Sequence, residues 1–166
     1  PSREPKLVPA PFQISFREWR VPPLGQRSRD PVQSPDGMIC WAGHWGNIVG
    51  RLNPRTGEMR EWPLPQGARP HSITSDRAGN IWYMGNSNGT VGKLDPKTGE
   101  ATVYILPDPA ARDPHTPIFD RNGVLWFTVQ NGNMVGRLNP ATGDIRLVKI
   151  PTPDADPYGI DIDSKG

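Results

Sequence analysis

The sequence has a single cysteine and no long apolar run among its 166 residues. Cys40 therefore has no partner for an internal disulfide and says little about the redox environment. No stretch approaches the ~18 apolar residues of a membrane-spanning helix, and the N-terminus lacks the apolar core of a signal peptide. We expect no membrane span. Because a signal can be removed from a mature protein, its absence leaves the compartment unknown. A periplasmic or secreted location is favoured, and a cytoplasmic one stays open.

An excess of charge of one sign is also missing. The chain carries 19 Lys and Arg against 17 Asp and Glu, a net charge of +2, and these residues are scattered along its length. This distribution lacks the basic footprint of a nucleic-acid-binding protein, so no nucleic-acid partner is expected. A sustained apolar period of 3.6 residues is absent as well, and we expect essentially no helix.

Proline and glycine are abundant, with 21 and 18 residues, whereas hydrophobic residues make up only 34% of the chain. Such a composition is found in disordered segments. The six tryptophans and the regular spacing described next favour a different interpretation, in which many short strands are joined by tight turns.

Three sequence elements repeat in step. A nine-residue segment beginning Gly-Arg/Lys-Leu occurs at 50–58, 92–100 and 136–144, at offsets of 42 and 44 residues. A Gly-x-apolar-Trp-aromatic segment occurs at 79–83 and 123–127, and at 37–41 with Cys40 in place of the tryptophan. A strand-like segment ending in proline occurs at 18–22, 61–65, 103–107 and 147–151.

A period of about 40 to 45 residues with four short strands is typical of a β-propeller blade. The segments 76–79 and 95–99 place proline and glycine where hairpin turns need them. We therefore predict an all-β protein, a propeller of four-stranded antiparallel blades. The expected organisation is a Pro-rich lead over 1–13, a lone outer strand over 14–21, blades over 29–64, 71–106 and 115–150, and the start of another blade over 157–166.

Three blades do not close a propeller ring, which usually has 4 to 8 blades. Open strand edges and apolar blade faces are rarely left bare. We expect the remaining blades of the same protein, or a protein partner, to cover them.

The composite repeat Pro-His-x-Ile, Asp-x-x-Gly-x-Ile-Trp-Phe-Thr, Gly-Arg-Leu-Asp-Pro-x-Thr-Gly-Glu and Leu-Pro resembles that of the virginiamycin B lyase (streptogramin lyase) family. The resemblance implies a seven-bladed propeller and a Mg-dependent elimination that opens a cyclic depsipeptide at its ester bond. It implies that Mg or another divalent metal is bound mainly by residues outside this sequence. Many repeats of the family carry Glu after Trp-Phe-Thr, whereas this chain has Gly43, Gly85 and Val129 there.

Candidate site residues are those that differ between blades on one face. In a four-stranded blade, the connections from the fourth strand to the next blade and from the second strand to the third share a face, and such loops commonly carry function. Imidazole, guanidinium and phenol groups there suit an anionic or carbonyl-bearing ligand, small molecule or peptide, and histidine can act as a base near neutral pH. The aligned first residues of the innermost strands are Arg29, His71, His115 and Tyr158, and the loops add His44, Trp45 and Asn131.

We take His71 and His115 as candidate catalytic residues and Arg29, His44, Trp45, Tyr158 and Asn131 as candidate ligand-binding residues; metal ligands stay unassigned. In the alternative interpretation each histidine only begins an inner strand, with its imidazole bonded to nearby backbone, and the amides only make turns.

Three functions are compatible with this sequence. The first is a metal-dependent lyase that opens an ester or lactone by elimination at the channel mouth. The second is a non-catalytic propeller that binds a ligand or protein, and the third is a gluconolactonase-like metal-dependent hydrolase. Fold alone does not choose among them. The sequence has no Cys-x-x-Cys, His-Glu-x-x-His or Gly-x-Ser-x-Gly motif.

Overall fold

A computed structural model describes residues 17–22, 25–65 and 67–165. The described residues form twelve strands and no helix, and therefore no helix that could cross a membrane. The strands are β1 (Ser28–Gln33), β2 (Ile39–Gly43), β3 (Ile48–Leu52), β4 (Met59–Pro63), β5 (Ile73–Ser75), β6 (Ile81–Gly85), β7 (Thr90–Leu94), β8 (Ala101–Ile105), β9 (Pro114–Phe119), β10 (Leu125–Val129), β11 (Met134–Leu138) and β12 (Ile145–Lys149).

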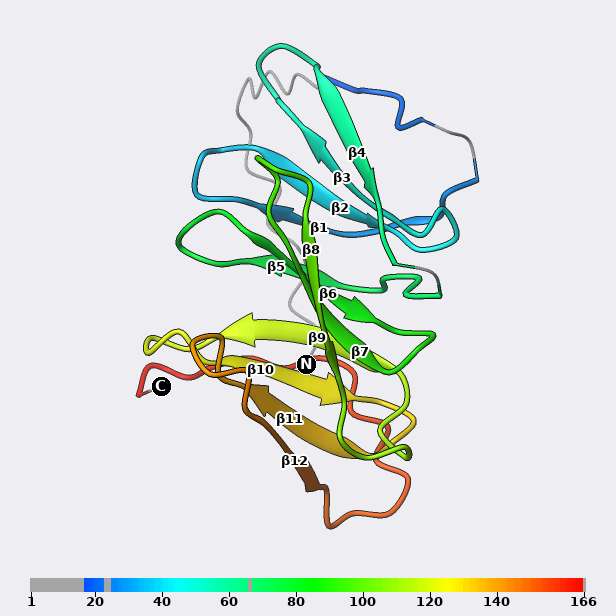
Figure 1. Cartoon of the computed structure of the whole chain (residues 1–166), viewed down its shortest axis with the longest axis vertical. Helices are drawn as coiled ribbons and strands as arrows, with labels where there is room; N and C mark the ends of the chain where they lie inside the picture. Colours follow the sequence, from blue (N-terminus) through cyan, green and yellow to red (C-terminus); the bar gives the residue numbers. More distant parts are fainter. Residues whose placement is uncertain (1–16, 23–24, 66, 166) are drawn as a thin grey trace, which may run out of the picture.

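The strands form three four-stranded antiparallel sheets in the simplest order, β1 to β4, β5 to β8 and β9 to β12. Figure 1 shows the three sheets stacked one on another, with β8 and β12 toward the viewer. This arrangement confirms the predicted fold class, an all-β structure of propeller blades. We call the sheets the first, second and third blade.

The two kinds of turn between strands explain much of the repeated sequence. In the second blade the Asp76 carboxylate accepts hydrogen bonds from the backbone N–H groups of Ala78, at 3.0 Å, and Asn80, at 2.9 Å. Gly79 closes this turn at a φ of +87°, which glycine adopts without steric cost. Between β7 and β8, the Asp95 carboxylate accepts from the Lys97 N–H in the same manner.

A cross-strand pair of an aromatic ring and a glycine recurs in every blade. Tyr83 lies opposite Gly92, and a Cβ added to this glycine would come within 1.9 Å of the tyrosine ring. Trp41 with Gly50 and Phe127 with Gly136 repeat the arrangement. The glycine that opens the repeated Gly-Arg/Lys-Leu segment is therefore required to seat the ring of the neighbouring strand.

The core consists of the two interfaces between blades. One buried cluster joins the first and second blades and includes Cys40, Trp62, Ile81 and Tyr83. The other joins the second and third and includes Trp82, which is fully buried and stacks on Tyr104 at a ring-centroid distance of 5.7 Å. Each blade thus buries one face against the next. This packing places the corresponding loops of the three blades next to one another on the same side of the molecule.

Two expected strands are absent from the described residues. Residues 17–21 of the strand expected over 14–21 are irregular, and so are residues 157–163 at the expected start of another blade. A strand needs a hydrogen-bonded neighbour, and no described strand flanks either segment. Residues 14–16 and 166, and the Pro-rich lead over 1–13, lie outside the described residues.

Candidate functional site

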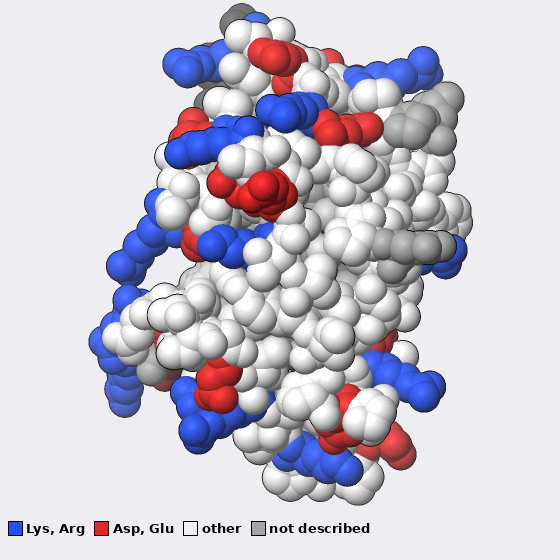
Figure 2. All heavy atoms as spheres, in the orientation of Figure 1, with Lys and Arg blue, Asp and Glu red and all other residues white. Residues whose placement is uncertain are grey.

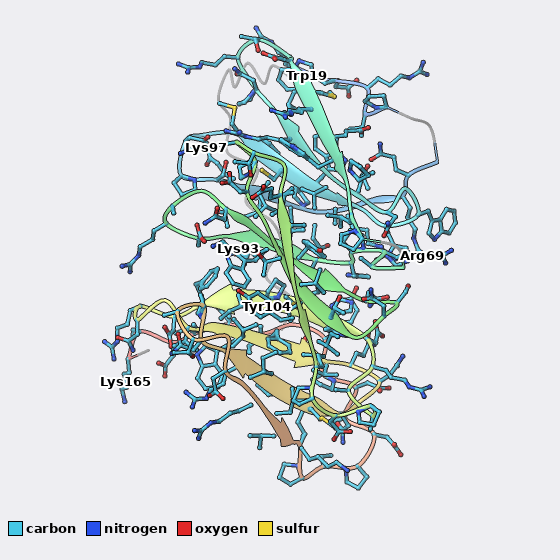
Figure 3. The ribbon with its side chains drawn as sticks, viewed as in Figure 1. Trp19, Arg69, Lys93, Lys97, Tyr104 and Lys165 are labelled. Atoms are coloured by element: carbon cyan, nitrogen blue, oxygen red, sulfur yellow. The ribbon has the colours of Figure 1, made fainter. Side chains whose placement is uncertain are left out.

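The candidate site lies on the side of the blades that carries the β2–β3, β6–β7 and β10–β11 connections. These connections share the right-hand side of Figure 1, and the connections within each blade from β5 to β6 and from β9 to β10 lie on the left. Figure 3 places Arg69 on the right-hand side and Lys97 and Lys165 on the left. We call the right-hand side the loop face.

Four of the predicted residues form a continuous row of rings. The His71 and His115 ring centroids are 3.8 Å apart, and those of His115 and Tyr158 are 3.9 Å apart. His44 lies edge-on to His71 at 6.0 Å. The row therefore runs from the first blade across the second and third to the segment that follows β12, and it contains all three histidines of the chain. We call these four residues the ring row.

The histidines of the ring row are held in the neutral state. Burial, the nearby His115 and the Arg29 charge together lower the pKa of His71 to about 4. Burial also lowers the pKa of His115 and of His44. Imidazoles packed against one another cannot all be protonated, because each charge would lose water and repel the next. At neutral pH the row presents uncharged rings with nitrogen lone pairs.

Asp30 fixes the orientation of His71 from the neighbouring blade. The Ser72 hydroxyl donates a short hydrogen bond to the Asp30 carboxylate, and the same hydroxyl oxygen lies 3.2 Å from His71 Nδ1. Because the carboxylate only accepts, the Ser72 proton is committed to Asp30, and the oxygen is left to accept from His71. His71 therefore carries its proton on Nδ1, and its Nε2 keeps a free lone pair.

Thr128 ties the end of the row to the third blade. Its hydroxyl oxygen accepts a hydrogen bond from the Thr116 N–H at 3.1 Å and donates to the Tyr158 carbonyl at 2.9 Å. His115 Nδ1 lies 3.0 Å from the Thr116 hydroxyl, as His71 Nδ1 lies by Ser72. The alternative interpretation, in which each imidazole bonds nearby backbone, does not describe these two contacts, which are to side-chain hydroxyls.

The other three predicted residues are placed differently. Arg29 lies close enough for its charge to lower the pKa of His71 and His115, and its Nε has no hydrogen-bond partner among the described residues although it is buried. Trp45 is 63% exposed on the loop face with the Arg27 guanidinium 5.1 Å from its ring centroid. Asn131 is exposed in the β10–β11 turn and is not part of the ring row.

The sequence prediction missed the charged position two residues before each first residue of an inner strand. Arg27, Arg69, Asp113 and Asp156 all have positive φ, between 42° and 64°. Bulky residues rarely adopt this backbone conformation, and it commonly marks functional sites. Aligning residues two places before the ring row would have revealed the position. The position is basic in the first two repeats and acidic in the last two. The charge on the loop face therefore changes sign along the stack of blades.

A metal site is not assembled by the described residues themselves, which contain no group of three or more His, Cys, Asp or Glu side chains placed to hold an ion. Asp30 and the histidines supply one carboxylate and neutral imidazoles along a row. Their packing against one another does not fit a closed ligand shell. The metal expected from the family resemblance therefore does not fit these residues, and we derive no step through it.

Comparison with known proteins assigns the family. Residues 13–166 match the model of the virginiamycin B lyase family. The chain belongs to this family. No curated protein sequence matches it.

Solved structures of virginiamycin B lyases agree with this assignment. A catalytically inactive variant of virginiamycin B lyase from Staphylococcus aureus, crystallised with quinupristin, is 31% identical with a TM-score of 0.79. A streptogramin B lyase structure is 30% identical with a TM-score of 0.75. Each alignment covers 86% of this chain and 47% of the other, so the chain spans about half the length of these virginiamycin B lyase structures.

A gluconolactonase from Xanthomonas campestris shares the fold alone. It is 17% identical, with a TM-score of 0.60 over 72% of this chain and 46% of its own. This likeness places both proteins among propellers and carries no statement about substrate.

Proposed function

We propose that the whole protein opens a cyclic ester by elimination, and that the loop face of these blades forms one wall of its substrate site. Family membership supports the reaction class. The observation that carries the site is the ring row, in which residues from separate repeats meet at contact distance. A rigid scaffold that brings distant side chains together on a loop face is the usual setting of a binding site.

Elimination constrains what the site must do. A base removes a proton from the carbon next to the one that bears the ester oxygen, a C=C bond forms, the C–O bond breaks, and a carboxylate leaves. No water is added. The site therefore needs a base, a means to stabilise the developing carboxylate charge, and a wall that orients the ring of the substrate.

The ring row suits the last of these tasks best. A general base is most efficient when its pKa lies near the working pH, and a pKa of about 4 leaves His71 a weak base. We therefore assign His71 and His115 to contact and orient the substrate, in place of the catalytic role expected from the sequence. Arg29 is suited to bind the leaving carboxylate, because its buried Nε has no hydrogen-bond partner among the described residues.

Cyclic depsipeptides are the substrate class that we propose. The similar Staphylococcus aureus structure was obtained with quinupristin. Flat, uncharged rings and amides on the loop face match the rings and amide groups of such compounds, whereas a strongly charged substrate would need an excess of opposite charge. Figure 2 shows acidic and basic side chains interspersed on the side of the molecule that faces the viewer, with the loop face at the right-hand edge.

Product analysis with the whole protein tests the reaction. Elimination of a cyclic ester such as quinupristin yields a linear product of unchanged mass, whereas hydrolysis adds the mass of one water molecule. We expect a linear product of unchanged mass, detected by chromatography and mass spectrometry. A product heavier by one water would overturn the lyase and favour the gluconolactonase-like hydrolase.

A non-catalytic binding propeller is the second candidate. It is favoured by the closely packed rings of the ring row, in which His71, with a pKa of about 4, offers a contact surface and not an efficient base. In that case the cyclic ester binds to the whole protein but is recovered unchanged, with or without added divalent metal. Binding without turnover would therefore identify this function.

A further inference from the structure

A hollow on the loop face lies where the second blade connects to the third. Its volume is about 480 Å³, within the range of small-molecule sites. It is bounded by the β6–β7 turn on one side and by the connection from β8 to β9 on the other. Asp113 belongs to its lining and is separated from His115 of the ring row only by Pro114. We call this hollow the side pocket.

The side pocket has a glycine at the place where the other two blades have an asparagine. Asn47, Gly89 and Asn133 occupy the same place, since the carbonyl of each accepts a hydrogen bond from the backbone that follows the fourth strand of its blade. In the first blade Asn47 lines the corresponding hollow, which has a volume of about 450 Å³, and its side chain joins two sides of that hollow: its Nδ2 donates to the Leu64 carbonyl at 2.9 Å, and its Oδ1 accepts from the Arg69 N–H at 2.7 Å. Gly89 has no side chain to do this.

The connection that faces Gly89 is also longer. Residues 107–114 exceed the equivalent residues 65–70 by two. The side pocket therefore differs from the corresponding hollow of the first blade in its lining more than in its volume. It has the longer loop, no side chain at position 89 crosses it, and it lies beside the ring row.

The two walls of the side pocket differ in chemistry. On one wall the side chains of Asn86 and Ser87 make no hydrogen bond to the described residues. Asn88 accepts a hydrogen bond from the Thr90 hydroxyl at its Oδ1, and its amide nitrogen has no partner among these residues. Together these groups offer donors and acceptors, as a peptide group requires. The other wall is largely apolar, formed by Leu106, Pro107, Pro109 and Ala111.

We propose that the side pocket binds an amide-linked apolar residue of a peptide substrate. Peptide N–H and C=O groups match the unpaired amides and hydroxyl, and an apolar side chain matches the opposite wall. No aromatic platform lines the pocket, as stacking of a sugar ring would need, and its charged lining residues, Asp108, Arg112 and Asp113, are of both signs. The identification of the ligand as a peptide rests on the proposed function.

Restoring the missing asparagine tests the assignment. Gly89→Asn introduces the residue found at this place in the other two blades, and asparagine tolerates the φ of +65° there, as Asn47 and Asn133 do at 52°. Its Cβ would lie 3.2 Å from the Ala111 carbonyl, so the loop must yield slightly. The probe is N-acetyl-leucyl-glycinamide, which has three amide groups, an apolar side chain and no ester.

Binding of this probe to the whole protein is followed by NMR titration. We expect saturable shifts at Gly89 and Ala111, an affinity lowered at least about tenfold by Gly89→Asn, and no change in the control Asn133→Gly. Asn86→Ala, which removes a half-exposed side chain without a hydrogen-bond partner among the described residues, is expected to weaken binding as well and decides the test if Gly89→Asn does not fold. Isoamyl alcohol, an apolar probe without amides, is expected not to bind.

Three results would overturn the proposal: no saturable binding of the probe, equal affinity of wild type and the folded variants, or equal binding of isoamyl alcohol. Because the probe has no ester, these outcomes do not depend on turnover. A protein that opens no cyclic ester but binds the probe at Gly89 would contradict the proposed function and leave the side pocket assignment intact.

Discussion

The imidazole of His71 is held by residues of two blades, and this arrangement determines which of its nitrogens is free. Ser72 follows it in the chain, whereas Asp30 belongs to the first blade. The free Nε2 lone pair is the feature that a substrate N–H could use. His71 thus combines a fixed tautomer with an uncharged ring.

Removing the hydroxyl relay should change the tautomer of His71. We predict that nitrogen-15 NMR of the whole protein finds the wild-type proton predominantly on Nδ1. Ser72→Ala removes the acceptor of that proton, so the fraction protonated on Nε2 should rise, and Asp30→Asn should act in the same direction because a neutral amide no longer commits the Ser72 proton. A wild-type His71 protonated on Nε2 would contradict the arrangement.

Acid should destabilise the fold through the same residue. The pKa of His71 is lowered from 6.5 to about 4, so between these values the unfolded chain binds a proton that the folded protein does not. Stability is then fully present above about pH 6.5 and declines as the pH falls toward 4, by up to about 3 kcal/mol for this group. Urea unfolding of the whole protein at pH 7 and pH 5 measures the loss.

The control for this pH dependence is His71→Gln, which keeps a polar side chain but does not titrate in this range. Its loss of stability between pH 7 and pH 5 should be smaller than that of wild type. An equal loss would show that His71 does not carry the effect.

Single residues were predictable from the sequence when their role repeats. His71, His115 and Tyr158 were found because they occupy one place in successive repeats. Asp30 was not found, because its partner Ser72 lies in another blade. The two residues also occupy the same place of successive repeats, where the third repeat has Thr116, so the residue type at this place changes from blade to blade. A hydrogen bond between blades leaves no pattern within one repeat.

At the scale of strands and turns, two residues that contact each other differ together from one blade to another. The indole N–H of Trp82 donates to Asp76 at 2.9 Å, and Trp126 to Asp120 at 3.0 Å. In the first blade both members differ: Cys40 stands for the tryptophan and Ser34 for the aspartate, with sulfur and oxygen 4.0 Å apart. Where the smaller Cys40 replaces the tryptophan, Ser34 also replaces the aspartate, and a buried polar contact between the two positions is kept.

The glycine opposite each aromatic ring should be essential to its blade. Gly92→Ala places a Cβ within 1.9 Å of the Tyr83 ring, so the ring must leave its position against the first blade. We expect a loss of about 1–3 kcal/mol, as for other overpacked cores. Gly159→Ala, where nothing lies within 4 Å, is the matched control. Equal unfolding midpoints of the two variants in urea would contradict this role.

The strand prediction succeeded within the three blades because alternation and turn residues are local signals. It failed over residues 17–21 and 157–163 because pairing depends on a neighbour that local sequence does not specify. Trp19 nevertheless packs on Gly57, as Trp62 packs on Gly99 and Tyr104 on Gly143. It therefore lies where the aromatic residue of a preceding outer strand would lie.

Across the whole molecule, the blades form a stack with different ends. Trp19 covers the turn of the first blade, and Val148 of the outermost strand of the third blade is 67% exposed. On the loop face the charged rim changes from Arg27 and Arg69 to Asp113 and Asp156. A polar substrate would be oriented by this change of sign, with its electronegative groups toward the first two blades.

The central claim is that the ring row forms a wall of the substrate site on the loop face. A crystal structure of the whole protein with a bound cyclic ester tests it most directly. We predict that the ligand lies in van der Waals contact with His71, His115 and Tyr158. A ligand bound on the opposite face, or one that leaves these three rings untouched, would contradict the claim.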